Sequence, residues 1–207
     1  MNPESKHTRT PQPRRLASRG WLALSMLTVI GCGAGPHPDP PPPCGQLCQD
    51  GVALRGLRSA IKFAYNYKIA TQPVGAQDAI TPCYSEDGSH GGTVHIFGDA
   101  TVNAVQGASI VSLSYDFQSC LFSAPPDPSA DQNFSLMFTG LVTEQGTLSV
   151  QPTATTALIL ESTALSISGT VYDPAEQYSA TDCALSVLQN GNAVSGALCG
   201  RYAGFSF

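Results

Sequence analysis

Residues 111–117 read Val-Ser-Leu-Ser-Tyr-Asp-Phe, an unbroken alternation of apolar and polar side chains. Successive side chains of a β-strand point to opposite faces of a sheet, so this stretch would bury its four apolar residues on one face and expose Ser and Asp on the other. A helix would scatter the same residues around its circumference. The alternation therefore predicts a half-buried strand.

The same period of two recurs on both sides of this stretch. Apolar residues occupy every second position of 61–69 and of 134–139. Further β-like runs cover 92–97, 101–105, 147–151, 156–161, 164–172, 183–189 and 193–199. Short strands spaced about ten residues apart, with Gly, Asn-Gly or Asp-Pro between them, are typical of antiparallel sandwiches and barrels.

We therefore predict an all-β fold, an antiparallel β-sandwich or meander barrel of about 8–10 strands with disulfide bonds and little helix. The single candidate helix covers residues around 45–58, and Gly51 and Gly56 weaken that interpretation because glycine disfavours helix interiors. Gly-Thr-aliphatic triplets at 92–94, 146–148 and 169–171 suggest three similar strand starts.

Charge is scarce and unevenly distributed. The chain has 207 residues, of which 12% are charged and 42% hydrophobic, which suits one folded domain. Residues 1–31 hold five of the ten basic side chains, whereas between Lys68 and Arg201 there are twelve acidic residues and no Lys or Arg. Binding to nucleic acid requires cations that neutralise phosphates, so this balance argues against nucleic-acid partners, and equally against phosphorylated substrates and anionic headgroups.

The N-terminus has the layout of an export signal. A basic segment that ends at Arg19 precedes an apolar run at 21–30, which is too short to span a bilayer as a helix. Val29-Ile30-Gly31-Cys32 then resembles the lipobox of bacterial lipoprotein precursors. The resemblance implies cleavage before Cys32 and lipid on its thiol. An ordinary secretory signal, in which Cys32 is incidental, is the alternative.

The lipobox divides the chain into three parts. Residues 1–31 would be the lipoprotein signal peptide, 32–43 the lipidated cysteine with a Pro-rich spacer, and 44–207 a single β-domain. A polyproline spacer rises about 3.1 Å per residue and would hold the domain clear of the lipid surface. In the lipoprotein family a residue other than Asp after the cysteine favours the outer membrane, and here that residue is Gly33. The resemblance therefore implies an outer-membrane protein, facing either the periplasm or the cell surface.

The remaining cysteines are even in number and would form disulfides in an oxidising compartment. Cys183 and Cys199 flank an Asn-Gly turn signal, and a three-residue loop at 190–192 would place them opposite each other. A two-residue loop at 190–191 would instead turn Cys199 to the other face. The remaining four would make two more bridges: Cys44, Cys48, Cys83 and Cys120. Zinc binding by the first two is the competing interpretation, although no second close pair follows.

The C-terminal third carries a second resemblance. Cys183, Gln189-Asn190-Gly191-Asn192, Ser195-Gly196 and Cys199-Gly200 form a pattern similar to one in uncharacterised β-rich lipoproteins of Gram-negative bacteria. These motifs are structural, and the resemblance implies no particular activity.

The residues offer little catalytic chemistry. No nucleophile motif of a Ser-His-Asp hydrolase is present. The loop 85–92 is the densest polar stretch and, with the strand that follows it, supplies the weak candidates for a metal site: Glu86, Asp87, His90 and His95. Carboxylates and imidazole are metal ligands, but Asp, Gly and Ser also form ordinary turns.

Aromatic side chains on the predicted inner faces would form a core or, alternatively, line a ligand cavity. They are Phe63, Tyr65, Tyr67, Tyr115, Phe117, Phe134 and Phe138. The sequence thus predicts a membrane-anchored cell-envelope lipoprotein that acts as a binding or structural module, without catalysis or a cofactor. Its partners would be the membrane, through the lipid, and a protein or small hydrophobic ligand. A β-barrel carrier of a small hydrophobic ligand is the alternative, and a metal-assisted hydrolase the third reading.

Overall fold

The computed structural model describes residues 40–68, 74–84, 88, 90–103, 107–149 and 155–207. Pro40–Phe207 forms one compact unit. Its elements follow one another as α1 Gln46–Lys68, β1 Gly75–Tyr84, β2 His90–Asn103, β3 Ala108–Ser123, the 3-10 turn η1 Ala130–Gln132, β4 Phe134–Ser149, β5 Ala157–Val171, β6 Glu176–Asn190, β7 Ala193–Leu198 and β8 Arg201–Ser206.

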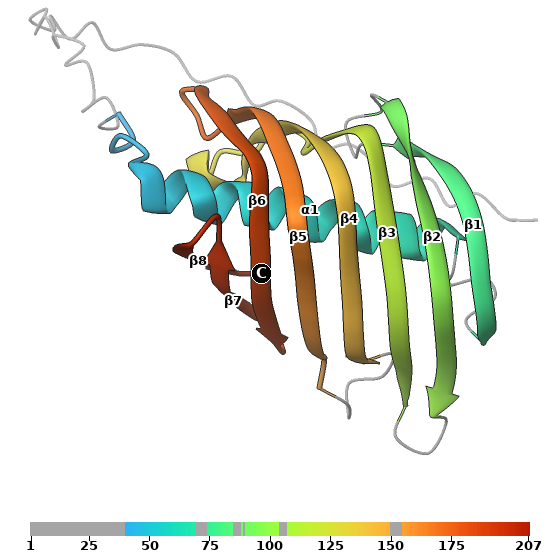
Figure 1. The fold of residues 1–207 in the computed structure, drawn as a ribbon. Coiled ribbons are helices and arrows are strands. Elements are labelled where there is room, and N and C mark those ends of the chain that lie inside the picture. The colour runs from blue at the N-terminus through green and yellow to red at the C-terminus, as the bar shows by residue number, and fades with distance from the viewer. Residues whose placement is uncertain (1–39, 69–73, 85–87, 89, 104–106, 150–154) are drawn as a thin grey trace, which may run out of the picture. The chain divides into compact units, whose positions relative to one another are not determined.

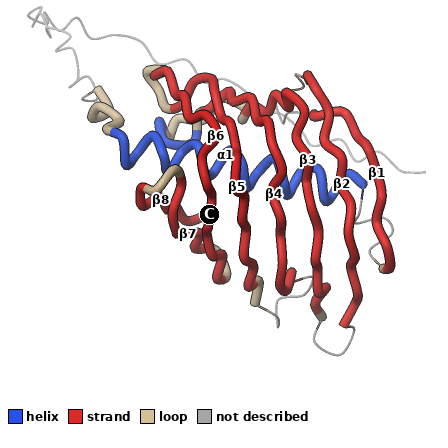
Figure 2. Tube along the Cα trace, viewed as in Figure 1, coloured by secondary structure: helices blue, strands red, loops and turns tan. Residues whose placement is uncertain are grey.

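The eight strands form one antiparallel meander in sequence order, which confirms the predicted antiparallel architecture. Every described strand pairs with its neighbours along the chain, and the sheet does not close into a barrel. α1 runs across the strands on one face of the sheet (Figures 1 and 2). Because the chain reverses direction at each turn, the β2–β3, β4–β5 and β6–β7 connections lie at one end of the sheet. The β3–β4 and β5–β6 connections lie at the other end.

The prediction of a strand at 61–69 was wrong, because 61–68 is the second half of α1. The buried positions of this helix follow a helical spacing, with Leu54, Leu57, Ile61 and Ala64 all turned to the sheet. The alternating aromatic residues at 63–67 do not share one face, because they lie on a helix. Phe63 contacts the sheet, with its ring centroid 5.7 Å from that of Phe122, whereas Tyr67 is half exposed at the helix end.

Gly51 and Gly56, which weakened the helix prediction, are points of close approach between α1 and the sheet. A Cβ on Gly56 would lie 2.9 Å from the Leu136 Cδ1 atom, and a Cβ on Gly51 would lie 3.1 Å from the Gly204 carbonyl oxygen. Glycine therefore lowers the intrinsic helix propensity but permits the helix to approach the strands closely.

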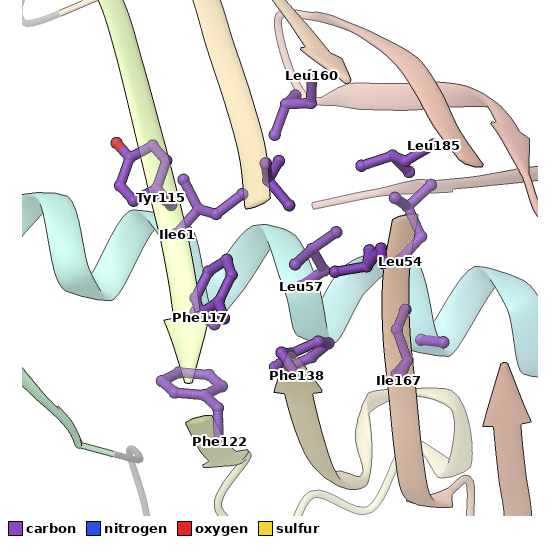
Figure 3. Packing of buried hydrophobic residues seen from close by; sticks show 14 of the residues in the cluster. Leu54, Leu57, Ile61, Tyr115, Phe117, Phe122, Phe138, Leu160, Ile167 and Leu185 are labelled. Carbon is purple, nitrogen blue, oxygen red and sulfur yellow. The ribbon is translucent and has the colours of Figure 1, made fainter. Parts of the chain in front are cut away.

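The core lies between α1 and the inner face of the sheet. Figure 3 shows Leu54, Leu57 and Ile61 of the helix facing Phe117, Phe138 and Ile167 of the strands. All of these side chains are almost fully buried. The opposite face of the sheet carries mainly Ser, Thr and Gln, with some exposed apolar residues, among them Ile110 and the cross-strand pair Ile159 and Leu188.

The strands are longer than predicted. The run 92–97 and residues 101–103 of the run 101–105 belong to one strand, β2, and the runs 134–139 and 147–151 overlap a single strand, β4. Gly98 and Gly140 lie inside these strands with φ of 128° and 122°. A Cβ at either position would lie within 2.4 Å of a carbonyl oxygen on the neighbouring strand. These glycines therefore mark irregular positions within strands and not turns.

The same correction applies to the Gly-Thr-aliphatic triplets. Gly92, Gly146 and Gly169 all lie inside strands with positive φ, so the triplets do not mark strand starts.

The C-terminal hairpin contains the predicted Cys183–Cys199 disulfide in a register that the sequence did not predict. Asn190 pairs with Ala193, so the loop is Gly191-Asn192, one residue later than either predicted loop. β7 ends at Leu198, and Cys199 with Gly200 forms the turn into β8, both with positive φ. Cys199 reaches Cys183 from this turn, where its backbone N–H donates to the carbonyl of Ala184 at 2.9 Å.

Candidate functional site

A pocket of about 920 Å³ opens beside α1, at the end of the sheet that carries the β2–β3, β4–β5 and β6–β7 connections. Its volume lies within the range of small-molecule sites. The described lining residues are Arg58, Lys62, Tyr65 and Asn66 of α1, Val102, Ser109, Glu144, Leu148, Ser149 and Gln189 of the strands, and Thr155, Thr156, Gly191, Asn192 and Phe207.

The floor of the pocket contains a buried ion pair. Arg58 Nη2 lies 3.5 Å from Glu144 Oε1, and the two side chains are 5% and 1% exposed. The helix supplies the arginine and β4 the carboxylate. Glu144 lies an even number of positions after the buried residues Phe138 and Val142, so its side chain points to the same inward face of the strand.

Neighbouring side chains complete this polar floor. The Tyr115 hydroxyl donates to Glu144 Oε2 at 2.7 Å, and Arg58 Nε donates to Gln189 Oε1 at 2.6 Å. Gln189 Nε2 in turn donates to the Gly191 carbonyl at 2.9 Å. Burial, together with the Glu144 carboxylate, holds the pKa of Tyr115 well above its usual value, so this phenol remains a hydrogen-bond donor.

One atom of this floor lacks a hydrogen bond. Glu144 Oε1 is buried and receives no hydrogen bond from any described residue, although the Arg58 guanidinium lies beside it. Buried carboxylate oxygens are normally hydrogen-bonded, because desolvation without a donor is costly. Its recorded partner is the Arg58 guanidinium, 3.5 Å away, so the ion pair balances the charge of this oxygen.

The rim of the pocket is exposed and carries a single cation among its described lining residues. Lys62 lies one helical turn beyond Arg58, and its Nζ atom sits 5.6 Å from the centroid of the Phe207 ring. Phe207 is 50% exposed. The Phe207 backbone N–H donates to the Asn192 carbonyl at 3.0 Å, which holds Phe207 beside the pocket.

A second buried carboxylate lies near the other end of α1 and is fully engaged. Asp50 accepts two hydrogen bonds from Arg201, at 2.7 and 2.8 Å, and one from the Tyr178 hydroxyl at 2.8 Å. Gln46 Nε2 donates a fourth at 3.0 Å. Burial would raise the pKa of Asp50, but these bonds outweigh it and hold that pKa below its usual value. This cluster ties α1 to β6 and β8, and none of its residues lines the pocket described above.

The residues predicted for a metal site do not line the pocket where the structure describes them. Glu86 and Asp87 lie outside the described residues, and His90 begins β2. His95 Nε2 lies 2.6 Å from Asp78 Oδ1, in a pair between β1 and β2. No group of three or more His, Cys, Asp or Glu among the described residues is placed to hold a metal ion.

The six domain cysteines form three disulfides, Cys44–Cys48, Cys83–Cys120 and Cys183–Cys199. The first two cysteines are therefore joined to each other, where the competing interpretation had them bind zinc. Cys32 lies outside the described residues.

The predicted inner aromatics belong mainly to the core. Tyr115, Phe117 and Phe138 are at most 1% exposed, and Tyr65 alone of the seven lines the pocket. The pocket is therefore not the aromatic cavity that the hydrophobic-carrier reading required. Burial raises the pKa of Tyr65, although its hydrogen bond with Ser109 acts in the opposite direction.

Comparisons with family models, with curated proteins and with solved structures find no match for this chain. In the part of the chain that the structure describes, no helix is both long and apolar enough to cross a membrane.

Sequence reasoning missed this pocket because its residues come from distant parts of the chain. One signal was present: Glu144 occupies a position where the alternation of its strand calls for an apolar residue, two residues after Val142. A charged residue at an inward position of an alternating strand indicates a buried charge that needs a partner.

Proposed function

We propose that the protein is a lipid-anchored module of the cell envelope that binds a small polar molecule in the pocket beside α1. The observation that carries this proposal is the Arg58–Glu144 pair, which is buried at the floor of an open cavity. Buried charged groups that face a concave pocket are a common mark of binding sites.

Two buried carboxylates among the described residues, Asp50 and Glu144, differ in their surroundings, and the difference supports this assignment. Asp50 has donors to both oxygens and does not line this pocket, as expected of a group that fastens a helix to a sheet. Glu144 has one oxygen without a hydrogen bond and lines the pocket. The Arg58–Glu144 pair thus places charged groups beside the cavity, where they can interact with a polar ligand.

The lining suits a small molecule with both polar and apolar parts. Ser109, Ser149, Thr155 and Asn192 offer neutral hydrogen-bonding groups. Val102, Leu148 and Phe207 add apolar surface.

The anchor rests on the lipobox resemblance at Cys32 and on the Pro-rich residues that follow. The chain joins the folded unit at the β5–β6 end of the sheet, where the Tyr172 hydroxyl donates to the Pro42 carbonyl at 2.7 Å. The Cys44 N–H donates to Glu176, at the start of β6.

Two experiments test the two halves of the proposal. Metabolic labelling with a palmitate analogue should modify the wild-type protein and leave Cys32→Ala unlabelled. Equal labelling of both would contradict the anchor.

Binding is tested on the unlipidated Cys32→Ala chain, by amide NMR spectra recorded with fragments that span acids, bases, neutral polar and apolar molecules. Shifts should gather at the lining residues. Thr155→Trp, which fills the rim, should abolish them, and Thr139→Trp, at an exposed strand position outside the pocket lining, should not. The binding function would be wrong if no fragment of any class shifted the lining residues.

A further inference from the structure

We infer that the face of the sheet opposite α1, here called the outer face, docks a protein partner through a basic, amphipathic segment. This segment would carry Lys or Arg beside apolar side chains. The inference does not depend on the pocket, which lies on the inner side of the sheet. The docking surface is the outer-face patch, which consists of Phe97, Asp99, Asp116, Ile159, Glu161 and Leu188.

The outer face is not covered by the described helix. α1 packs on the inner face only and lies behind the strands in Figure 1, so that view looks onto the outer face. The patch residues alternate along their strands with buried residues such as Ile96 and Leu158 and therefore point outward. Ile159 and Leu188 are directly paired across β5 and β6, yet they remain 45% and 59% exposed. Neighbouring exposed apolar side chains on an uncovered face favour contact with a partner.

Strand pairing aligns the patch in two adjacent rows that cross the sheet from β2 to β6. The first row consists of Asp99, Ser112, Gln145, Ile159 and Leu188. The second row consists of Phe97, Ser114, Thr143, Glu161 and Ser186. Strands lie about 4.8 Å apart, so each row is about 19 Å long. A helix of about thirteen residues that lies across the strands has this length.

The charge of the outer face has one sign. β1–β7 contain no Lys or Arg, and Arg201 of β8 is paired with Asp50 beneath α1. The patch carboxylates have no ion-pair partner among the described residues. His95 lies opposite Asp116 in the strand register, but its Nε2 atom contacts Asp78. A cationic partner is therefore complementary to this face, whereas a second copy of the same face would bring carboxylates together.

Acidic and apolar groups occupy different ends of the patch. Phe97 and Asp99 lie two residues apart on β2, and Asp116 is a diagonal neighbour of Phe97 on β3. An Arg or Lys side chain can contact the Phe97 ring and these carboxylates together. Ile159 and Leu188 lie at the β5–β6 end of the same rows. The partner segment would thus place cations over β2 and β3 and apolar side chains over β5 and β6.

The test uses three blocked peptides with the unlipidated Cys32→Ala chain. The first is a tandem repeat of Leu-Lys-Lys-Leu, the second has Glu in place of Lys, and the third has Ser in place of Leu. In NMR titrations the Lys–Leu peptide should shift the amide signals of the outer-face patch. It should bind at least about tenfold more tightly than the other two, because each of them lacks one of the two complementary features. Its affinity should fall as salt is added.

The acidic end is tested by Asp99→Asn combined with Asp116→Asn. This variant should bind the Lys–Leu peptide about tenfold more weakly, because two exposed ion pairs are lost. Asp127→Asn combined with Asp173→Asn is the matched control. It makes the same change in net charge at exposed residues of the β3–β4 and β5–β6 connections and should leave the affinity within about twofold.

The apolar end is tested by Leu188→Thr, which keeps a β-branched residue in the strand. It should weaken binding of the Lys–Leu peptide about fivefold, through the apolar contact that is lost. Met137→Thr is the control, because Met137 is an exposed apolar residue of β4 near the β3–β4 connection and outside the patch. Both positions are exposed, so neither change should unfold the domain.

Three results would overturn the inference. Equal weakening by the two charge variants would show attraction to net charge alone, and equal binding of the Glu–Leu peptide would show apolar contact alone. Patch signals that shifted with the concentration of the protein by itself would identify a second copy as the occupant. None of these results bears on fragment binding at the pocket lining, so the docking surface and the proposed binding function can fail separately.

Discussion

Asp50→Asn should destabilise the domain by about 2–3 kcal/mol at neutral pH. The side chain of Asp50 is 1% exposed and accepts hydrogen bonds from Arg201, Tyr178 and Gln46. In the variant, one carboxylate oxygen becomes an NH₂ group that faces the Arg201 guanidinium, so a charge-assisted pair is replaced by two opposed donors. The Arg201 side chain is 45% exposed, and water therefore limits the loss to less than that of a fully buried pair.

The loss in free energy of unfolding is measured by denaturant titration at pH 7. In a thermal melt, a loss of this size should lower the Tm of a domain of this length by about 5–10 °C. Asp131→Asn is the matched control, since the Asp131 carboxylate lies 3.5 Å from Arg55 but is 53% exposed. That change should cost at most about 0.5 kcal/mol.

The pH dependence has a definite sign. The pKa of Asp50 is held below its usual value in the folded protein, so its stabilisation is complete above the unfolded pKa, about 3.9. The stabilisation is lost as the pH falls through the lower folded value. The difference between wild type and Asp50→Asn should therefore shrink below about pH 4. A variant as stable as wild type at pH 7, or a difference that stayed constant into acid, would refute this account.

Three further changes test the packing, each by denaturant titration. Replacing both Cys83 and Cys120 with alanine removes a disulfide of sequence separation 37. This should lower the free energy of unfolding by about 4 kcal/mol, the value given by the loop entropy of the unfolded chain. Gly56→Ala should cost about 1–2 kcal/mol despite the helix propensity of alanine, because its Cβ would lie 2.9 Å from a side chain of β4. Tyr115→Phe removes the donor to Glu144 Oε2 and should cost about 1–3 kcal/mol.

Each of these changes has a control. Replacing Cys44 and Cys48 with alanine removes a disulfide of sequence separation 4, and the loss of stability should be about half that for the longer bridge. Asn66→Ala, at an exposed position of α1, should slightly stabilise the helix. Tyr202→Phe, at a residue 65% exposed, should leave stability unchanged. Equal losses at both bridges, a stabilising Gly56→Ala or a silent Tyr115→Phe would each contradict the packing described above.

The strands were predictable because one face of the sheet is buried and the other is not. The stretch at 111–117 alternates in the structure as it does in the sequence, and its four apolar residues are almost fully buried. The strand lengths were not predictable by the same rule. Glycine at a turn and glycine at an irregularity within a strand look alike in a sequence, and Gly98 and Gly140 are of the second kind.

The candidate helix around 45–58 overlaps the first half of α1, but the second half of the helix escaped prediction for a different reason. Aromatic residues at 63, 65 and 67 fit a strand over a short window, and only a window that begins near Val52 shows the helical spacing of buried positions. Gly51 and Gly56 then argued against a helix that packing against the sheet stabilises. The tertiary contacts of the helix with the sheet outweigh the low intrinsic helix propensity of these glycines, as is common in proteins.

The cations of the folded unit explain why so charge-poor a sequence specifies one placement of its helix. Four of them lie on α1 and one on β8: Arg55, Arg58, Lys62, Lys68 and Arg201. Each of the three arginines pairs with a carboxylate on another element, Asp131, Glu144 and Asp50 respectively. Apolar packing tolerates a helix that slides or rotates on a sheet, but a displaced helix would leave Glu144 and Asp50 buried without partners. Lys62 lines the pocket and has no carboxylate within ion-pair distance among the described residues, so this role does not account for it.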